Sequence, residues 1–109
     1  MTDKIVVLSS CGSADEARKV ARHLVETRLA ACVTILPGAT SIYHWQGKVE
    51  EAPEWVLLIK TSRANFEALS AALATIHSYQ VPEIVAVQIV DGSPMYLEWL
   101  SREVREDHQ

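Results

Sequence analysis

Three residues that could ligate a metal ion lie far apart along the chain, each beside a predicted element. Cys11 follows a short apolar run, His77 lies at the end of a helical pattern, and Glu83 begins the last apolar run. Thiolate, imidazole and carboxylate groups are the common protein ligands of transition metals. A thiolate together with an imidazole suits copper or zinc better than magnesium or calcium. We therefore take Cys11, His77 and Glu83 as candidate ligands of copper or another divalent transition metal, with Tyr79 and Trp45 shaping the site.

The same residue types also have ordinary structural interpretations. A cysteine after a buried strand is commonly a small packed side chain, and a histidine near a helix C-terminus can bind the last carbonyls of that helix. Glu83 could pair with a basic residue across an interface. Cys32 lies within a predicted strand and is expected in the core, whereas His23 and His108 are expected in solvent. The residue types alone leave both interpretations open.

Motifs of several enzyme classes are missing from the sequence. Cys11 precedes a predicted helix, where backbone amides favour anions, but the phosphatase loop Cys-x5-Arg needs an arginine at the position of Ala17. The phosphate-binding pattern G-x-x-x-x-G-K-[ST] and the metalloprotease pattern H-E-x-x-H are both absent. The chain is therefore predicted to be a binding protein and not an enzyme.

The longest predicted feature is a β-hairpin between Ala30 and Lys60. Its arms are rich in β-branched and aromatic residues and meet at a turn near residues 46–48, which is typical of a hairpin. Pro37 and the glycine after it interrupt the first arm and favour a bulge or an edge position. Each arm exceeds the usual strand length of about 5–6 residues. A small domain cannot cover such a hairpin alone, so its apolar edges predict an obligate oligomer.

Shorter elements flank the hairpin on both sides. The apolar run at 5–10 predicts a buried strand, and Ser13 with Glu16 matches the capping box that begins a helix. Ser62 is the expected N-cap of a second helix. A proline at 82 separates that helix from a strand predicted over 83–90, and Ser93, followed by proline, begins a third helix.

This order of elements predicts the fold. Strand-helix-strand-strand-helix-strand is the ferredoxin-like α+β sandwich, with a four-stranded antiparallel sheet and both main helices on one face. The long hairpin joins the second and third strands, and the third helix is an addition at the C-terminus. One such domain accounts for residues 1–109. The topology also brings Cys11, His77, Tyr79, Glu83 and the hairpin tip to one end of the sheet.

Composition narrows the range of partners. With a net charge of −4, the chain lacks the basic surface that non-specific nucleic-acid binding needs. No apolar run approaches the roughly 20 residues of a membrane span, and the N-terminus lacks the pattern of a signal peptide. We expect a cytoplasmic protein without nucleic-acid or membrane partners. Its two cysteines are then expected to be reduced thiols.

Several segments carry a resemblance to a known family. They read ACVTILPGATSIYHWQGKVEE, VLLIKT, HSYQVPEIVAV and GSPMYLEWL in chain order, and together they resemble the CutA family of divalent-cation tolerance proteins. The resemblance runs from Ile5 to about Arg105. It implies a ferredoxin-like subunit, a tight homotrimer built by the long hairpins, and an association with copper and other divalent cations. It also implies a general likeness to the trimeric PII signalling proteins, which bind small effectors between subunits.

Some positions carry the family pattern and others depart from it. His77, Tyr79, Pro82 and Glu83 match the motif before the last strand, and Cys11 matches the residue after the first strand. Glutamines at 46 and 80 stand where the family pattern is acidic, which lowers the local negative charge. A weaker cation site with an unchanged fold is the expected consequence.

Two other functions stay open at this level. A PII-like regulatory or scaffold trimer would bind an organic anion or a protein partner in clefts between subunits, through basic residues such as Lys48 and Lys60. A purely structural trimer would bind metal only adventitiously. The main prediction is a cytoplasmic homotrimer that binds divalent or copper ions and contributes to metal tolerance.

Overall fold

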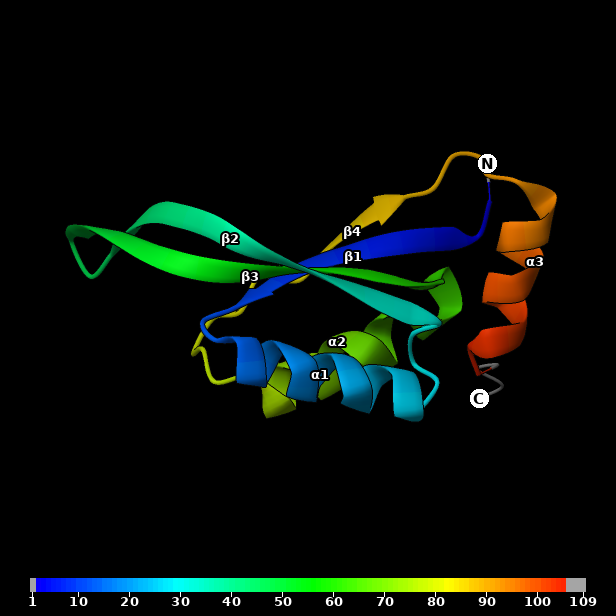
Figure 1. The fold of residues 1–109 in the computed structure, drawn as a ribbon, viewed down its shortest axis with the longest axis horizontal. Helices are drawn as coiled ribbons and strands as arrows, with labels where there is room; N and C mark the ends of the chain where they lie inside the picture. Colours follow the sequence, from blue (N-terminus) through cyan, green and yellow to red (C-terminus); the bar gives the residue numbers. More distant parts are fainter. Residues whose placement is uncertain (1, 106–109) are drawn as a thin grey trace.

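The computed structural model describes residues 2–105 and has the element order that the sequence predicts (Figure 1). The predicted α+β class, the ferredoxin-like topology and the added C-terminal helix are confirmed. The elements are β1 (Lys4–Cys11), α1 (Ala14–Glu26), β2 (Cys32–Trp45), β3 (Lys48–Ser62), the 3₁₀ turn η1 (Arg63–Asn65), α2 (Phe66–Ile76), β4 (Val85–Gln88) and α3 (Pro94–Glu103).

The strands form one four-stranded antiparallel sheet in the order β2-β3-β1-β4. α1 and α2 lie together on one face of this sheet (Figure 1). Ala17, Val20 and Leu24 recur at helical spacing and are fully buried, because this stripe of α1 packs on the sheet. They meet alternate residues of the strands, among them Val7 and Ile59. This layer is the main hydrophobic core.

Serine side chains begin two of the helices as predicted. The Ser13 hydroxyl accepts a hydrogen bond from the amide of Glu16 at 3.1 Å, and Ser93 caps α3 in the same way. The prediction for Ser62 is wrong, because this residue precedes η1 and makes no capping hydrogen bond with its side chain. Ser62 is still paired with Lys4 in the sheet, so the backbone stays extended there and α2 begins one short turn later.

β2 and β3 form a hairpin of 14 and 15 residues that extends beyond the body of the sheet (Figure 1). Its turn consists of Gln46 and Gly47, whose φ angles of 52° and 83° are the left-handed values that type I′ turns need. The pairing register shifts around Pro37, so the predicted bulge is present, and β2 is an edge strand. Ile42 and Val49 leave 65% and 66% of their surface exposed near the tip.

The last strand is shorter than predicted, and the third helix lies at one end of the sheet (Figure 1). β4 covers Val85–Gln88 and not 83–90, because it pairs only with the Ile5–Leu8 part of β1. α3 stands at the end of the sheet away from the hairpin tip (Figure 1), where Leu100 and Val104 form a second small cluster with Ala31. No helix within residues 2–105 is long and apolar enough to cross a membrane.

The sheet face opposite α1 and α2 is largely free of covering elements among residues 2–105 (Figure 1). Side chains alternate along a strand, so Val6 and Leu8 point away from the core that Ile5 and Val7 enter. Cross-strand pairing adds further apolar residues to this side. We call this set the uncovered face; it consists of Val6, Leu8, Leu36, Val56, Leu58, Val85 and Val87.

Cys32 also lies on this second side, so its predicted place in the core is wrong. It pairs with Lys60, is half-buried, and holds its sulfur 3.7 Å from the hydroxyl of Tyr96 in α3. The strand itself is predicted correctly. Which way a residue faces depends on the register, which an apolar run does not determine alone. His23 is exposed as predicted, whereas His108 lies outside the described residues.

Candidate functional site

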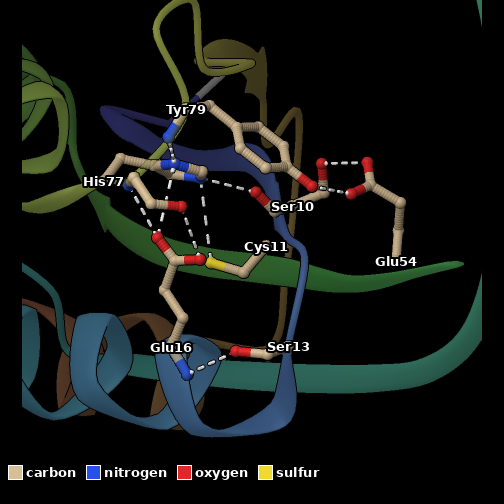
Figure 2. A network of polar contacts seen from close by, with 8 residues as sticks. Ser10, Cys11, Ser13, Glu16, Glu54, His77 and Tyr79 are labelled. Carbon is tan, nitrogen blue, oxygen red and sulfur yellow. Dashed lines mark hydrogen bonds and ion pairs between the residues drawn. The ribbon is translucent and has the colours of Figure 1, made fainter. Parts of the chain in front are cut away.

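The candidate site lies at the end of β1, where neighbouring residues point to opposite sides of the sheet (Figure 2). Cys11 faces the helix layer and is fully buried in the main core. Ser10 faces the other side, where its hydroxyl donates to the carboxylate of Glu54 at 2.8 Å. The alternation of the strand therefore creates two polar clusters, one on each side of β1.

The first of these, the thiol cluster, consists of Cys11, Glu16 and His77 (Figure 2). Its sulfur, carboxylate oxygen and ring nitrogen all lie within 4.8 Å of one another. The sulfur of Cys11 is 3.8 Å from Nε2 of His77, and Oε2 of Glu16 is 3.6 Å from Nδ1. The three residues come from the end of β1, the first turn of α1 and the C-cap of α2. Cys11 and His77 thus meet as the topology predicts, while their role as ligands stays a prediction.

Both ring nitrogens of His77 are already hydrogen-bonded to the backbone. Nε2 lies 2.6 Å from the carbonyl oxygen of Ser10, which can only accept, so Nε2 carries the proton. Nδ1 accepts a hydrogen bond from the amide of Tyr79 at 3.0 Å. These contacts select the neutral tautomer with the proton on Nε2 and hold a ring that is fully buried. A metal ion can bind a nitrogen of this ring only after one of the two hydrogen bonds breaks.

Cys11 is a neutral thiol in this environment. Burial, with smaller contributions from the negative charges of Glu16 and Glu54, raises the pKa of the Cys11 thiol to about 12. The thiolate is the form that binds metals and attacks electrophiles. A metal ion therefore has to displace the thiol proton as it binds.

Glu16 is the member of the thiol cluster that the sequence did not indicate as a ligand. The capping-box pattern assigns its carboxylate to the start of its own helix. The carboxylate instead reaches the loop after α2, where it accepts hydrogen bonds from the amide and the hydroxyl of Ser78 at 2.7 and 2.9 Å. Partial burial favours a higher pKa, but these hydrogen bonds outweigh it, and the pKa of Glu16 lies below its usual value. The spacing Cys-x4-Glu at a strand-to-helix turn is the signal that could have identified Glu16.

The second polar cluster, which we call the carboxylate cluster, lies on the other side of β1 and is centred on Glu54 of β3 (Figure 2). The Glu54 residue is only 6% exposed. One oxygen of Glu54 accepts hydrogen bonds from the hydroxyls of Ser10 and Ser41 at 2.8 and 3.1 Å. The other oxygen accepts one from the hydroxyl of Tyr79. Burial and this contact raise the pKa of Tyr79 above its usual value, so the phenol stays a donor. Sequence reasoning missed Glu54, whose only signal is a lone carboxylate before the apolar run that ends β3.

A cavity of about 690 Å³ opens beside the carboxylate cluster. Glu54, Tyr79, Tyr43, Trp45 and Glu83 are among the residues that line it. Glu83 is exposed and lies outside the thiol cluster, so its predicted role as a metal ligand stays a prediction. Tyr79 touches both clusters, because its ring packs 4.7 Å from the imidazole of the thiol cluster while its hydroxyl bonds Glu54. Trp45, also expected to shape the metal site, belongs to the cavity.

The donor set of the thiol cluster matches what copper and zinc bind in proteins. The arrangement is not ready for nucleophilic catalysis. The nitrogen of His77 that faces the sulfur already carries a proton, so it cannot take the proton of Cys11. Metal binding is thus the chemistry that these three side chains can perform, provided that the thiol proton and one imidazole hydrogen bond are given up.

A family model, related sequences and a solved structure all match this chain and all belong to one family. A family model described as CutA1 divalent ion tolerance protein matches residues 5–103. The divalent-cation tolerance protein CutA of Thermus thermophilus is 52% identical over 95 residues, covering 87% of this chain and 92% of the relative. The corresponding protein of Pectobacterium atrosepticum is 40% identical over 105 residues, which is 96% of both chains. A crystal structure of CutA from Xylella fastidiosa has a TM-score of 0.93 and 44% identity, covering 95% of this chain and 100% of that one.

Proposed function

Because the chain belongs to the CutA1 divalent ion tolerance family, we propose that it is a cytoplasmic binding protein for a divalent transition metal ion of the copper type. The proposed ligands are Cys11, Glu16 and His77. The protein contributes to metal tolerance by binding the ion and not by catalysis. The observation that carries this proposal is the convergence of three different donor atoms within 4.8 Å.

Glu16 is the proposed carboxylate ligand because its oxygen already faces the imidazole. Its Oε2 atom lies 3.6 Å from Nδ1 of His77, and its side chain is 17% exposed. Glu83 is exposed on the wall of the cavity and belongs to no group of converging ligand atoms among residues 2–105. Glu16→Gln and Glu83→Gln therefore distinguish the two candidate ligands, because only the variant that removes the true ligand should weaken metal binding.

Binding at the thiol cluster is expected to strengthen as the pH rises. The metal replaces the proton of Cys11, whose pKa is raised to about 12, so this proton is still bound throughout the neutral range. Each proton released on binding raises the apparent affinity about tenfold per pH unit. A site made only of exposed carboxylates would show almost no such dependence above pH 6, because those groups are already ionised.

Isothermal titration of Cu²⁺ and Zn²⁺ into chelator-treated protein tests the proposal. We expect one ion per subunit, an affinity that rises between pH 6 and pH 8, and a heat that depends on the buffer because a proton is released. Cys11→Ser and Glu16→Gln should each weaken binding at least tenfold, because even the loss of an outer-shell partner of a metal ligand costs about 10–100-fold in affinity. Cys32→Ser is the matched control and should bind like the wild type, since Cys32 lies on the other side of the sheet.

Two results would contradict the assignment. Unchanged affinity in Cys11→Ser would show that the ion binds elsewhere. A loss in Glu83→Gln with none in Glu16→Gln would make Glu83 the carboxylate ligand. Circular dichroism and unfolding curves for each variant separate a lost ligand from a lost fold.

We also propose that the protein acts as a homotrimer. Two surfaces support self-association: the uncovered face and the projecting hairpin. Val85 and Val87 on the uncovered face are 49% and 48% exposed, and Ile42 and Val49 on the hairpin are exposed further. Apolar surface gathered in this way favours burial against another subunit. A second copy of this chain is the partner that fits the family.

A further inference from the structure

The cavity beside Glu54 has the wrong charge for an organic anion. Its lining includes the carboxylates of Glu54 and Glu83, and no lysine or arginine is among the described residues that line it. Lys48 and Lys60, which an anion site would use, are not among the lining residues, although Lys48 is the cross-strand partner of Trp45. The ammonium of Lys60 donates to the hydroxyl of Thr34 at 2.9 Å. The lining instead favours a positively charged ligand.

Glu54 lies buried at this cavity without a compensating positive charge. It is 6% exposed, and its three hydrogen-bond donors are neutral hydroxyl groups. Within residues 2–105, Glu54 forms no ion pair. A buried carboxylate costs free energy unless it is both hydrogen-bonded and paired with a cation. A cation that enters the cavity would supply the missing half of this arrangement.

Aromatic rings form much of the remaining wall. Tyr43 and Trp45 are two residues apart in β2, so both side chains lie on the same face of the strand, where they are 44% and 40% exposed. The ring of Tyr79 lines the cavity from the loop after α2. Aromatic faces attract organic cations through their quadrupoles. A bare metal ion needs three or more converging ligands, and the thiol cluster is the only such group of His, Cys, Asp and Glu within residues 2–105. The wall thus suits an organic cation better than a metal ion.

We propose that this cavity binds a small organic ammonium ion, with its charge near Glu54 and Glu83 and its alkyl groups against Tyr43, Trp45 and Tyr79. The volume of about 690 Å³ falls within the range of small-molecule pockets. The ligand site uses none of the residues of the thiol cluster. The proposal can therefore be tested on the metal-free protein.

Isothermal titration with choline chloride tests the proposal on the chelator-treated, full-length protein. The matched neutral probe is 3,3-dimethylbutan-1-ol, which has the shape of choline without its charge, and sodium chloride keeps the ionic strength constant. We expect saturable binding of choline and at least threefold weaker binding of the neutral alcohol, since cation–aromatic and ionic attraction at exposed sites give effects of this size. Equal binding of the two probes, or no binding of choline, would overturn the proposal.

Variants of residues that line the cavity test whether choline binds there. Trp45→Leu and Glu83→Gln remove one aromatic face and one exposed charge, and each should weaken choline binding about threefold. Glu51→Gln is the matched control, because Glu51 is an exposed carboxylate of the same hairpin that does not line the cavity. Its choline affinity should equal that of the wild type. An equal loss in the control, or none in the two wall variants, would place choline outside the cavity and refute the assignment.

Discussion

At the scale of single residues, the thiol cluster is held in a form that resists the ion it is proposed to bind. The proton on Nε2 of His77 is donated to a backbone carbonyl, and the thiol of Cys11 is buried and protonated. Both groups are therefore neutral, and the packed core tolerates them without charge. An incoming metal ion brings the charge that makes a thiolate stable there. This couples occupancy of the site to proton release and to movement of the imidazole.

The state of Cys11 predicts its reactivity. Its pKa of about 12, against an ordinary thiol value of 9.0, lowers the thiolate fraction at pH 8 roughly 1,000-fold. We expect iodoacetamide to modify Cys32 in the native protein within the time in which Cys11 stays intact, and to modify both in urea. Peptide mass spectrometry reads the two sites separately. In the Cys32→Ser variant, native labelling at pH 8 should be nearly abolished, and rapid labelling there would contradict a buried, protonated Cys11.

The carboxylate of Glu16 predicts a pH-dependent contribution to stability. Its folded-state pKa is lowered, so its contribution is fully present above the ordinary carboxyl value and is lost as the pH falls through the folded-state value. Glu16→Gln should lower the free energy of unfolding by about 1.5–3 kcal/mol at pH 7, the range for hydrogen bonds to charged groups. The difference from the wild type should shrink below about pH 4. Urea unfolding at several pH values measures this.

Asp15→Asn is the matched control for that experiment. Asp15 occupies the same first turn of α1 and is exposed, so it shares the helix-dipole effect without the contact to Ser78. A control variant that loses as much stability as Glu16→Gln would assign the effect to the helix dipole. A difference that persists unchanged at pH 3 would contradict a charge-dependent role of Glu16.

Residue positions could be predicted from the sequence only where the topology decides them. Cys11 and His77 meet because one ends a strand and the other ends a helix at the same end of the sheet. The contact of Glu16 with Ser78 could not be predicted, since Ser78 lies in a loop whose path depends on tertiary contacts. Glu54 was missed because an acidic residue in a strand is ordinarily expected on the exposed side.

At the scale of elements, the hairpin turn predicts a stabilising change. Gln46 adopts a φ angle of 52°, which costs an ordinary L-residue about 1 kcal/mol, whereas asparagine tolerates it well. Gln46→Asn should raise the free energy of unfolding by about 0.5 kcal/mol. Gly47→Ala should lower it by about 1 kcal/mol through the backbone alone, since a methyl group there meets no atom within 4 Å. Thermal or urea unfolding of both variants checks the opposite signs.

Two equal shifts of the same sign in these variants would contradict a type I′ turn. The matched control is Gly12→Ala, which tests a glycine of a different kind. Gly12 has no left-handed φ, but an added methyl group would come within 3.0 Å of the hydroxyl oxygen of Tyr79. Any loss in the free energy of unfolding of Gly12→Ala therefore measures steric crowding beside the two clusters and not the geometry of the turn.

Elements were predictable where local chemistry and tertiary structure agree. The turn at 46–47, the bulge at Pro37 and the cap at Ser13 each follow from residue types that suit one backbone conformation. Ser62 and the ends of β4 were predicted less well because sheet pairing decides them. Ser62 stays extended opposite Lys4, and β4 ends where its partner strand no longer faces it. Local signals contain no information about those long-range pairings.

At the scale of the whole molecule, one end of the sheet holds the two polar clusters and the cavity, and β1 separates the clusters. Cys11 and Ser10 are neighbours in sequence, yet they serve chemically different environments. Tyr79 is the physical link, since its ring packs against the imidazole and its hydroxyl binds Glu54. An ion that displaced the His77 ring would therefore disturb the packing of Tyr79, whose hydroxyl bonds Glu54 beside the cavity. The two proposals thus predict coupled affinities whenever Tyr79 has to move for either ligand.

The uncovered face makes the final prediction, which concerns assembly. Val85 and Val87 are about half exposed in one chain, so their burial in a trimer is worth roughly 1 kcal/mol for each side chain. Val85→Lys with Val87→Lys should remove that gain, place charges in the interface, and leave the β1–β4 pairing intact because β4 is an edge strand. Light scattering after size exclusion should give three times 12.1 kDa for the wild type and 12.1 kDa for the double variant.

Val25→Lys is the control that distinguishes this surface from exposed apolar surface in general. Val25 is 39% exposed on α1, on the opposite side of the sheet, so its replacement should leave the trimer mass unchanged. A wild type at the mass of one chain would contradict the trimer. A double variant that keeps the trimer mass would instead make the hairpin the main contact, because Ile42 and Val49 would then supply the buried apolar surface. Only a double variant that keeps the trimer mass would show that the long hairpin, and not the uncovered face, holds the subunits together.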